Sequence, residues 1–396
     1  MMNFYEGQDA LFQQLNSIVD IEKIPLPEAN GRILAVPIDA QYDSPSFDNS
    51  AMDGFAICDL ECESWHIVGT VAAGDTTTYA LQPGEAMRIF TGAAVPEHSD
   101  AVVMQENVSV NEHTLTINSS LELGENIRRC GEELTQGQVI LSPGVLLTPE
   151  AIGLAASQGV RELLCYKRLR VTVFTTGDEL VSQNNPLYQH QIFDSNRPML
   201  IAMLKKYNFF EIIDGGTLPD KLEIISNNMI EAAQNSHAIV VSGGASMGDR
   251  DLVRPVLEKL GSVAQWQLAI KPGKPFGWGH IGSCQTVLLP GNPVASFVTF
   301  TLLGLPALQI MAGRHVFEAL PECSQARAGF DLIPNRQRRR EFLRGSLFFT
   351  PDGPKVVPLK KQGSHMLSSC VSASVLIDIP PQTDIHEGQW LTIYPL

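Results

Sequence analysis

The chain has 396 residues, too many for one ordinary hydrophobic core, so several domains are expected. Its net charge of -15 and pI near 5.0 exclude a general electrostatic attraction to nucleic acid, so any cationic site must be local. The seven cysteines form no CxxC pair and no metal-ligand spacing, which favours reduced thiols in the cytoplasm. The first twenty residues lack the basic start and apolar core of a signal peptide, which argues against secretion.

The first third of the chain predicts a helix followed by a β-rich module. Residues 4 to 19 carry apolar side chains at helical spacing. From Ser44 to Asn107, short apolar runs are cut by proline and glycine, as in a module of strands and turns. Within it, the segment 47–56 crowds Asp53 with other polar residues beside a glycine, and these residues alone favour an Asx-turn network. Thr91 precedes a glycine and belongs either to a ligand-binding loop or simply to the turn at the end of a strand.

From Leu169 to Ala312 strands and helices alternate, which predicts a doubly wound, mostly parallel sheet with helices on both faces. Strands are expected at 170–175, 209–213, 237–242, 265–270 and 285–289. Helices are expected near 195–206, 220–235, 251–260 and 293–312. The last one lies in a stretch without charged residues, but its prolines favour a buried helix against the sheet over a membrane span.

After Arg314 the alternation stops, and short strands as far as Tyr394 predict a small closing β-barrel or sandwich. A basic run at 336–340 is interpreted as a solvated face.

Four loops with glycine or polar side chains follow the predicted strands. They are the segments at 175–179, 243–244, 271–275 and 291–292. Functional loops of parallel α/β sheets gather at the carboxyl ends of the strands, so one binding crevice is expected here rather than four independent turns.

The charges in these loops indicate an oxyanion ligand. Lys271 and Lys274 are flanked by prolines that exclude a helix, so a stiff turn should hold both ammonium groups at one place. Asn292 and Pro293 predict the start of a helix whose N–H groups favour an anion. Acidic residues nearby, including Asp251, would serve a divalent cation.

Two other acidic residues have a simpler interpretation. Asp194 and Asp220 each precede a predicted helix and can act as N-caps.

Taken together, these motifs resemble the MoeA/gephyrin E-domain family of molybdopterin molybdenumtransferases. The resemblance covers nearly the whole chain, through residues 47–56, 88–106, 126–133, 175–180, 242–251, 270–275, 289–294, 342–345 and 363–365. The glycine-rich loop alone would also suit the related pterin adenylyltransferase domain, which would not need the flanking modules.

The resemblance implies that adenylylated molybdopterin and molybdate react to give molybdenum cofactor and AMP, helped by Mg²⁺. It implies contacts to molybdate or substrate from Ser246, Lys271, Lys274, Pro275, Gly291, Asn292, Arg344 and Ser364. It implies catalytic roles for Asp53, Thr91, Glu179, Asp220 and Asp251. Of these, Glu179, Asp220 and Asp251 are expected at the metal and the pterin phosphate.

The family's architecture implies a cytoplasmic homodimer in which the β-rich module of one subunit faces the crevice of its partner. That arrangement favours an active-site role for Asp53 over a purely local turn. Further expected partners are the pterin adenylyltransferase and acceptor molybdoenzymes, with no nucleic acid and no membrane.

Four domains are expected from this resemblance and from the changes in pattern along the chain. They are a discontinuous N-terminal and linker domain (1–43 and 134–168), an inserted β-rich module (44–133), a molybdopterin-binding α/β domain (169–313) and a C-terminal β-barrel (314–396).

Two residues depart from the family pattern, and two other functions stay open. Gln267 stands where relatives often carry lysine, and Glu133 where they often carry aspartate. Weaker affinity for molybdate or nucleotide is therefore one expectation. The first alternative is a noncatalytic pterin carrier, which would bind pterin without nucleotide turnover. The second is the preceding adenylylation with ATP.

Overall fold

The computed structural model describes residues 1–76, 79–118, 120–245, 252–334 and 336–396, without the side chains of residues 265 and 266. Their contacts divide the chain into two compact units. The first comprises Met1–Val36, Pro143–Gly153 and Arg161–Leu396, and the second comprises Pro37–Ser142 and Leu154–Val160. The four domain boundaries expected from the sequence stay a prediction.

The first unit contains a six-stranded sheet in the order β16-β13-β17-β21-β20-β18. Four strands are parallel: β13 (Leu169–Thr176), β16 (Phe210–Leu218), β17 (Ala238–Ser242) and β21 (Cys284–Leu289). At one edge, β20 (Pro275–Ile281) and β18 (Ser262–Gln267) run antiparallel to their neighbours. The sequence pattern does not predict β20, because its two glycines weaken the strand signal. The strand expected at 265–270 begins and ends earlier, since Ile270 belongs to another sheet.

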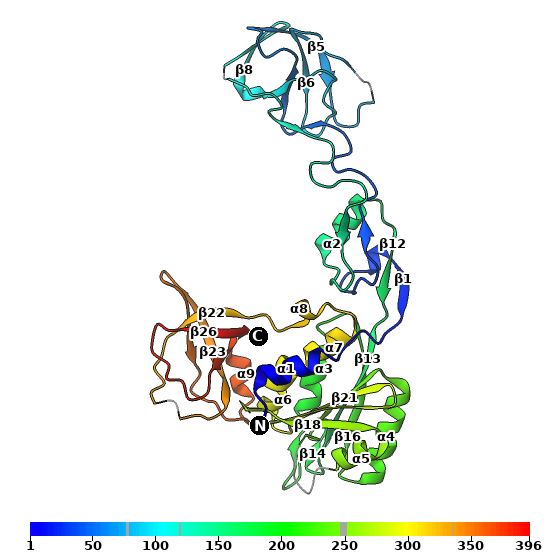
Figure 1. The fold of residues 1–396 in the computed structure, drawn as a ribbon, viewed down its shortest axis with the longest axis vertical. Coiled ribbons are helices and arrows are strands. Elements are labelled where there is room, and N and C mark those ends of the chain that lie inside the picture. Colours follow the sequence, from blue (N-terminus) through cyan, green and yellow to red (C-terminus); the bar gives the residue numbers. More distant parts are fainter. Residues whose placement is uncertain (77–78, 119, 246–251, 335) are drawn as a thin grey trace. The chain divides into compact units, whose positions relative to one another are not determined.

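Helices cover both faces of this sheet, which confirms the doubly wound arrangement (Figure 1). Along β17, Val240 packs in the same cluster as residues of α3 (Asn196–Leu204) and of the helix that begins at Pro293. Ile239 and Val241 point to the other face and pack with α4 (Leu222–Asn235) and α5 (Val253–Leu260). The alternation follows from the two-residue period of a strand.

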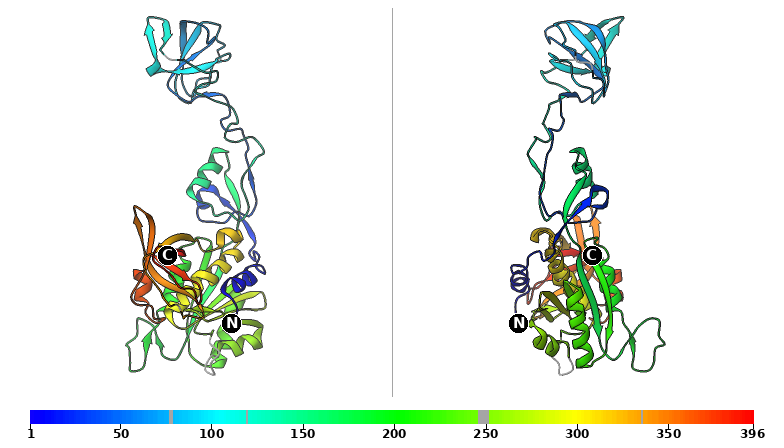
Figure 2. Two further views of the ribbon diagram at one scale, coloured as in Figure 1. Left: turned by 60° about the vertical axis from the view of Figure 1, so that its left-hand side comes forward. Right: turned by 90° about the vertical axis from the view of Figure 1, so that its right-hand side faces the viewer.

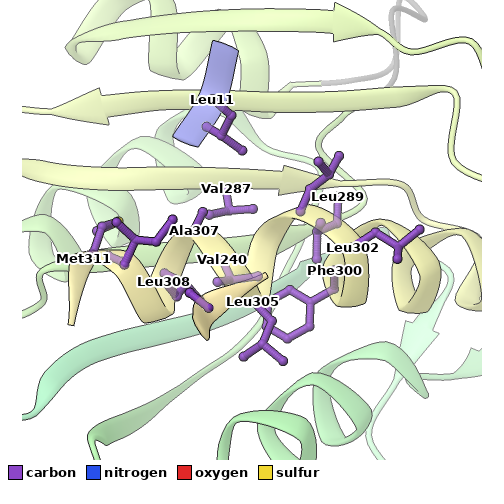
Figure 3. Packing of buried hydrophobic residues seen from close by; sticks show 14 of the residues in the cluster. Leu11, Val240, Val287, Leu289, Phe300, Leu302, Leu305, Ala307, Leu308 and Met311 are labelled. Atoms are coloured by element: carbon purple, nitrogen blue, oxygen red, sulfur yellow. The ribbon is translucent and has the colours of Figure 1, made fainter. Parts of the chain in front are cut away.

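The helix from Pro293 to Met311 is the most apolar element of the first unit. It consists of α6 (Pro293–Thr299), a π-helical turn η3 (Phe300–Gly304) and α7 (Leu305–Met311). Its 19 residues have the length and hydropathy of a membrane span, but 83% of the most apolar window is buried inside the protein. Figure 3 shows Phe300, Leu305 and Leu308 beside Val240 and Val287 of the sheet. The expected buried helix against the sheet is confirmed.

Truncation of Phe300 should strongly destabilise this unit. Its ring is fully buried in the core, so Phe300→Ala is expected to lower the free energy of unfolding by about 3–5 kcal/mol. Urea denaturation followed by circular dichroism measures the change. Phe349→Ala is the matched control, because 84% of Phe349 is exposed and its loss should leave the midpoint nearly unchanged. Equal shifts for both variants would contradict the assignment of the core.

Five C-terminal strands close into the expected small barrel, orange to red in Figure 2. They are β22 (Ser324–Ala328), β23 (Arg340–Thr350), β24 (Gly353–Pro358), β25 (Val375–Ile379) and β26 (Trp390–Pro395). Pairing of β23 with β25 completes the ring. The short strand β19 (Ile270–Lys271) adds to β23 with Ile270 opposite Arg340 and Lys271 opposite Glu341. The lysine loop is thereby joined to the barrel.

The N-terminal helix α1 (Phe4–Phe12) is shorter than the predicted segment 4–19 and packs against the barrel. The Phe4 ring meets the Phe342 ring edge-on at 5.1 Å, and the Tyr5 hydroxyl donates a hydrogen bond of 2.8 Å to Asp378. The remaining elements of this unit are short: β1 (Ile21–Pro25), η1 (Leu26–Glu28), β12 (Glu162–Tyr166), β14 (Leu180–Val181), β15 (Ile192–Phe193), α8 (Val316–Ala319) and α9 (Ser368–Ser372). Helix α2 (Pro149–Ser157) contributes residues to both units.

The second unit is β-rich, as expected for an inserted module. Its six-stranded sheet has the order β7-β4-β6-β5-β9-β8. The strands are β4 (Gly54–Ile57), β5 (Trp65–Val71), β6 (Glu85–Ile89), β7 (Ala101–Met104), β8 (Val108–Asn111) and β9 (Thr114–Ile117). Two small pairs and a 3₁₀ turn accompany it: β3 (Asn49–Ser50) with β10 (Ile127–Arg128), β2 (Ile38–Asp39) with β11 (Val139–Leu141), and η2 (Gln105–Asn107).

Candidate functional site

Two cavities adjoin at the carboxyl edge of the parallel strands, and both are lined by Gly291 and Asn292. Their volumes are about 630 and 790 Å³, within the range of small-molecule sites. The strand order reverses between β13 and β17, because the chain leaves β13 toward β16 on one side and leaves β17 toward β21 on the other. Ligands of open α/β sheets bind at such a topological switch point. The expected crevice is therefore present.

The first cavity, here the lysine cavity, carries positive charge. It is lined by Lys271, Pro272, Gly273, Lys274, Pro275, Pro290, Gly291, Asn292, Ala295, Arg339, Gln362, Gly363 and Ser364. The structure thus brings together six of the residues expected to contact molybdate or substrate: Lys271, Lys274, Pro275, Gly291, Asn292 and Ser364.

The two lysines differ in their surroundings. Lys271 Nζ lies 2.9 Å from Glu341 Oε1, so a carboxylate partly neutralises it. Lys274 is exposed and makes no ion pair within the described parts of the chain. Its ammonium group is therefore the one most ready to meet an anionic ligand.

Arg339 is a lining residue that the sequence analysis missed. Its Nη1 donates a hydrogen bond of 3.1 Å to the carbonyl oxygen of Ile270, within the lysine loop. The basic run at 336–340 predicts a solvated face, which the structure confirms for the exposed Arg338 but not for Arg339. Only the long-range pairing of β19 with β23 distinguishes the two residues.

Arg344, expected to contact molybdate, does not line the lysine cavity. It is 1% exposed and lies beneath the loop at 362–364, where its guanidinium donates to Ser369 Oγ at 3.1 Å and to the Gly363 carbonyl at 3.4 Å. Burial lowers the pKa of Arg344 below its ordinary value. From this position Arg344 supports the loop that carries Ser364.

The start of the helix at Pro293 is organised differently from the prediction. Asn292 occupies the N-cap position and Pro293 the first helical position, but the Asn292 side chain makes no capping bond. The N–H of Val294 donates to the Ser364 carbonyl at 3.0 Å. That donor is therefore used by the protein itself, and the expected anion cannot use it.

The second cavity, here the carboxylate cavity, is lined by Thr176, Gly177, Glu179, Leu180, Ile192, Phe193, Asp194, Ser195, Asn196, Asp220, Ser242, Gly243, Leu252, Gly291, Asn292, Pro293 and His365. Glu179 and Asp220, both expected at the metal, thus share one cavity. The Glu179 carboxylate folds back over Gly177, where a Cβ would lie 2.7 Å from Oε2. The expected site residues Ser246 and Asp251 lie outside the described residues.

Asp220 does not cap α4, whose N-cap residue is Lys221. Instead the Asp220 backbone N–H donates to Asp178 Oδ1 at 3.0 Å. This bond ties the loop after β16 to the loop after β13, and it keeps the Glu179 and Asp220 segments together.

Asp194 caps the start of α3 as expected, since its Oδ1 accepts the Arg197 backbone N–H at 3.2 Å, and it also lies in a buried network at the edge of the carboxylate cavity. It accepts hydrogen bonds from Thr175 Oγ1 at 2.6 Å and from the Arg197 side chain at 3.1 Å. Arg197 also binds Asp214 at 2.6 Å. Burial alone would lower the pKa of Arg197, but its bonds to Asp214 and Asp194 raise it above the ordinary value.

Asn196 and Gly243 fix the backbone of the crevice. Asn196 Nδ2 donates to Ser242 Oγ at 2.8 Å and to the Gly291 carbonyl at 2.7 Å, which joins the loops after β17 and β21. Gly243 has φ +112°, and a Cβ there would lie 2.6 Å from Thr176 Oγ1. Only glycine permits so close an approach of the two strand ends.

Glu179 and Asp220 have the chemistry that Mg²⁺ requires. Hard divalent cations prefer carboxylate oxygens, and Mg²⁺ usually keeps waters and binds substrate phosphates through one or two carboxylates. Within the described residues, no group of three His, Cys, Asp or Glu side chains forms a metal cage. Two carboxylates in an open cavity are therefore suited to a cation that also binds a substrate phosphate, rather than to a structural metal ion enclosed by protein ligands.

Sequence comparisons match three regions of the chain to known family models. Family models match residues 2–159 (MoeA N-terminal region, domain I and II), 172–310 (probable molybdopterin binding domain) and 325–396 (MoeA C-terminal region, domain IV). A molybdopterin molybdenumtransferase from Haemophilus influenzae is 37% identical over 401 residues, covering 100% of this chain and 98% of that protein. The chain belongs to the MoeA family.

Two further relatives extend the comparison. Gephyrin from Dictyostelium discoideum is 31% identical over 338 residues, which cover 74% of this chain and 47% of that protein. A crystal structure of the molybdopterin biosynthesis MoeA protein from Pyrococcus horikoshii has a TM-score of 0.83 and 27% sequence identity, with 100% of both chains covered. The MoeA fold expected from the sequence is therefore confirmed.

In the second unit of this MoeA chain, Asp53 and Thr91 form one local pair. Asp53 Oδ1 accepts hydrogen bonds of 2.8 Å from both the backbone N–H and the hydroxyl of Thr91. The backbone bond first, and then the hydroxyl bond, lower the pKa of Asp53 below its ordinary value. The pair is exposed, which keeps its carboxylate accessible. Its active-site role stays a prediction.

The two departures from the MoeA pattern lie outside both cavities. The backbone carbonyl of Gln267 on β18 accepts a bond of 2.9 Å from the Met2 N–H. The Glu133 carboxylate accepts a bond of 2.7 Å from the Ser44 hydroxyl within the second unit. Neither residue lines the lysine cavity or the carboxylate cavity.

Proposed function

We propose that this chain inserts molybdate into adenylylated molybdopterin and releases AMP, giving molybdenum cofactor. Membership of the MoeA family places it in molybdenum cofactor biosynthesis. The observation that carries the specific reaction is the pair of adjoining cavities with opposite charge, which share Gly291 and Asn292. The lysine cavity suits a free oxyanion, and the carboxylate cavity suits a cation bound to phosphate.

The lysine cavity is the proposed molybdate site. Molybdate is a tetrahedral dianion, and charge-assisted hydrogen bonds from ammonium groups are among the stronger ones that a protein can offer it. Lys274 and Lys271 supply such donors, and Ser364 adds a neutral one at the same cavity. Pro272 and Pro275 restrict the backbone of the loop and so reduce the freedom lost on binding.

The carboxylate cavity is the proposed site of the phosphoanhydride. When bound there, Mg²⁺ would neutralise charge on the phosphates as their bond breaks. Glu179 and Asp220 would hold it, together with Asp251, which lies outside the described residues. Asn196 and the Asp194 network keep the surrounding backbone in place, so the carboxylates meet the substrate with little rearrangement.

The proposal also includes a cytoplasmic homodimer in which Asp53 and Thr91 of one subunit complete the crevice of the other. The local geometry supports it. Thr91 holds Asp53 in its ionised form on an exposed surface, where a carboxylate can meet a ligand or metal from a second chain. The pterin adenylyltransferase and acceptor molybdoenzymes are the proposed partners before and after this step.

Purified protein supplied with adenylylated molybdopterin, Mg²⁺ and molybdate should release AMP. Chromatographic measurement of AMP tests the reaction directly. Tight pterin binding without AMP release would instead indicate a carrier. Nucleotide transfer from ATP without molybdate would indicate the preceding adenylylation.

Mixing two strongly impaired variants tests the shared site. Asp53→Ala and Lys274→Ala change residues in different units of the chain, so a mixed dimer carries one crevice with both original residues. Co-expressed and co-purified, the two variants should regain up to about a quarter to a half of the original AMP release. Homodimers of each single variant provide the control and should show no such recovery. No recovery in verified mixed dimers would contradict a site built from two subunits.

A further inference from the structure

The basic run at 336–340 divides into residues with different environments. Arg336 and Arg338 are exposed, whereas Arg339 is half-buried and lines the lysine cavity. Arg340 is engaged elsewhere, with its Nη1 at 2.7 Å from both carboxylate oxygens of Asp378. One arginine of this run therefore faces the same space as Lys271 and Lys274.

The backbone next to Arg339 is held on both sides. The N–H of Arg340 donates to the Ala269 carbonyl at 2.8 Å, at the start of the pairing between β19 and β23. Asp378, which binds the Arg340 side chain, is 3% exposed and also accepts the Tyr5 hydroxyl at 2.8 Å. Arg339 thus extends from a fixed position, and its Nη1 is anchored on the Ile270 carbonyl at 3.1 Å.

The charges around the lysine cavity then match a dianion. Lys271, Lys274 and Arg339 contribute three positive charges, and Glu341, the partner of Lys271, contributes one negative charge. The balance is two positive charges. A guanidinium presents several N–H donors in one plane, so the bond to Ile270 leaves others for oxygen atoms of a ligand.

We propose that Arg339 is an oxyanion-binding residue of the lysine cavity and donates to the tetrahedral dianion that Lys271 and Lys274 hold. The inference rests on the proposed function, since molybdate is the dianion of that reaction. It adds a third cationic contact to the site. It also gives the Tyr5–Asp378–Arg340 cluster a role in positioning that contact.

Calorimetric titration of molybdate into the purified full chain, without pterin, tests the contact. Arg339→Gln removes the charge but retains an amide N–H that can still bond to Ile270. Its Kd for molybdate should rise about tenfold or more. Arg339→Lys should fall between Arg339→Gln and the original protein, because it keeps the charge and loses the planar donors. Arg338→Ala, from the same run but outside the cavity, should leave Kd unchanged.

Steady-state AMP release provides a second measurement that a merely structural role would not reproduce. Arg339→Gln should raise KM for molybdate, with unchanged KM for the adenylylated pterin and an unchanged thermal melt. Equal molybdate affinity for Arg339→Gln and Arg338→Ala, in a protein that releases AMP normally, would overturn this inference alone. An original protein that neither binds molybdate nor releases AMP would overturn the proposed function as well.

Discussion

Lys274→Ala is expected to lower kcat/KM for molybdate in AMP release by about 10- to 100-fold. Lys274 is exposed in the lysine cavity and makes no ion pair within the described part of the chain, so no neighbouring carboxylate is left unpaired by its removal. The loss therefore reports the missing charge-assisted bond to the ligand, which is worth about 1.5–3 kcal/mol. AMP release measured over a range of molybdate concentrations gives the value.

Lys206→Ala is the matched control for this variant. Lys206 is also exposed, follows α3 and lines neither cavity. It should keep the original kcat/KM, and both variants should keep the original thermal melt. If both lysine variants lost the same activity, the effect would come from net charge rather than from the lysine cavity.

Glu179→Gln and Asp220→Asn are each expected to reduce AMP release about a hundredfold at low Mg²⁺ and to raise the Mg²⁺ concentration needed for half-maximal rate. The two carboxylates line the same cavity, and each replacement keeps shape while removing one negative charge. Loss of a hard anionic ligand weakens a site that holds its cation through few protein groups. Rates at increasing Mg²⁺ concentration measure both effects.

Asp352→Asn is the control for the carboxylate variants. Asp352 is an exposed turn residue between β23 and β24 and lines neither cavity. Its Mg²⁺ dependence should match that of the original protein. If Glu179→Gln also kept the original Mg²⁺ dependence, the assignment of the carboxylate cavity to the metal would be wrong.

Local sequence patterns were sufficient to predict the parallel core. The strands around Val240 and Val287 are short apolar runs, and the helix at 293–311 has the composition of a core element. These features depend on residues close together in the chain. The strand at 275–281 was missed because it is built around two glycines and is defined by its antiparallel partners, which a linear pattern does not reveal.

Local patterns also predicted some residues of the candidate site, whereas others depend on long-range pairing. Lys271, Lys274 and Glu179 could be placed near strand ends from their loops alone, whereas Asp220 was expected at the site only through the family resemblance. The structure puts all four in two adjoining cavities. Arg339 could not, because its neighbours in the basic run have the same side chain and only the register of β19 on β23 selects it. Arg344 matched a family motif, yet its position beneath the loop at 362–364 depends on how the barrel closes.

The hydrogen bond between Val294 and Ser364 joins main-chain atoms of the α/β core to main-chain atoms of the barrel's loop. The bond uses no side-chain atom, so most substitutions at these two positions leave it intact, even though Val294 is fully buried in the core and Ser364 lines the lysine cavity. Proline at position 294 is the exception, since it has no N–H to donate. The main chain alone thus keeps the loop that presents Ser364 in register with the start of the helix at Pro293.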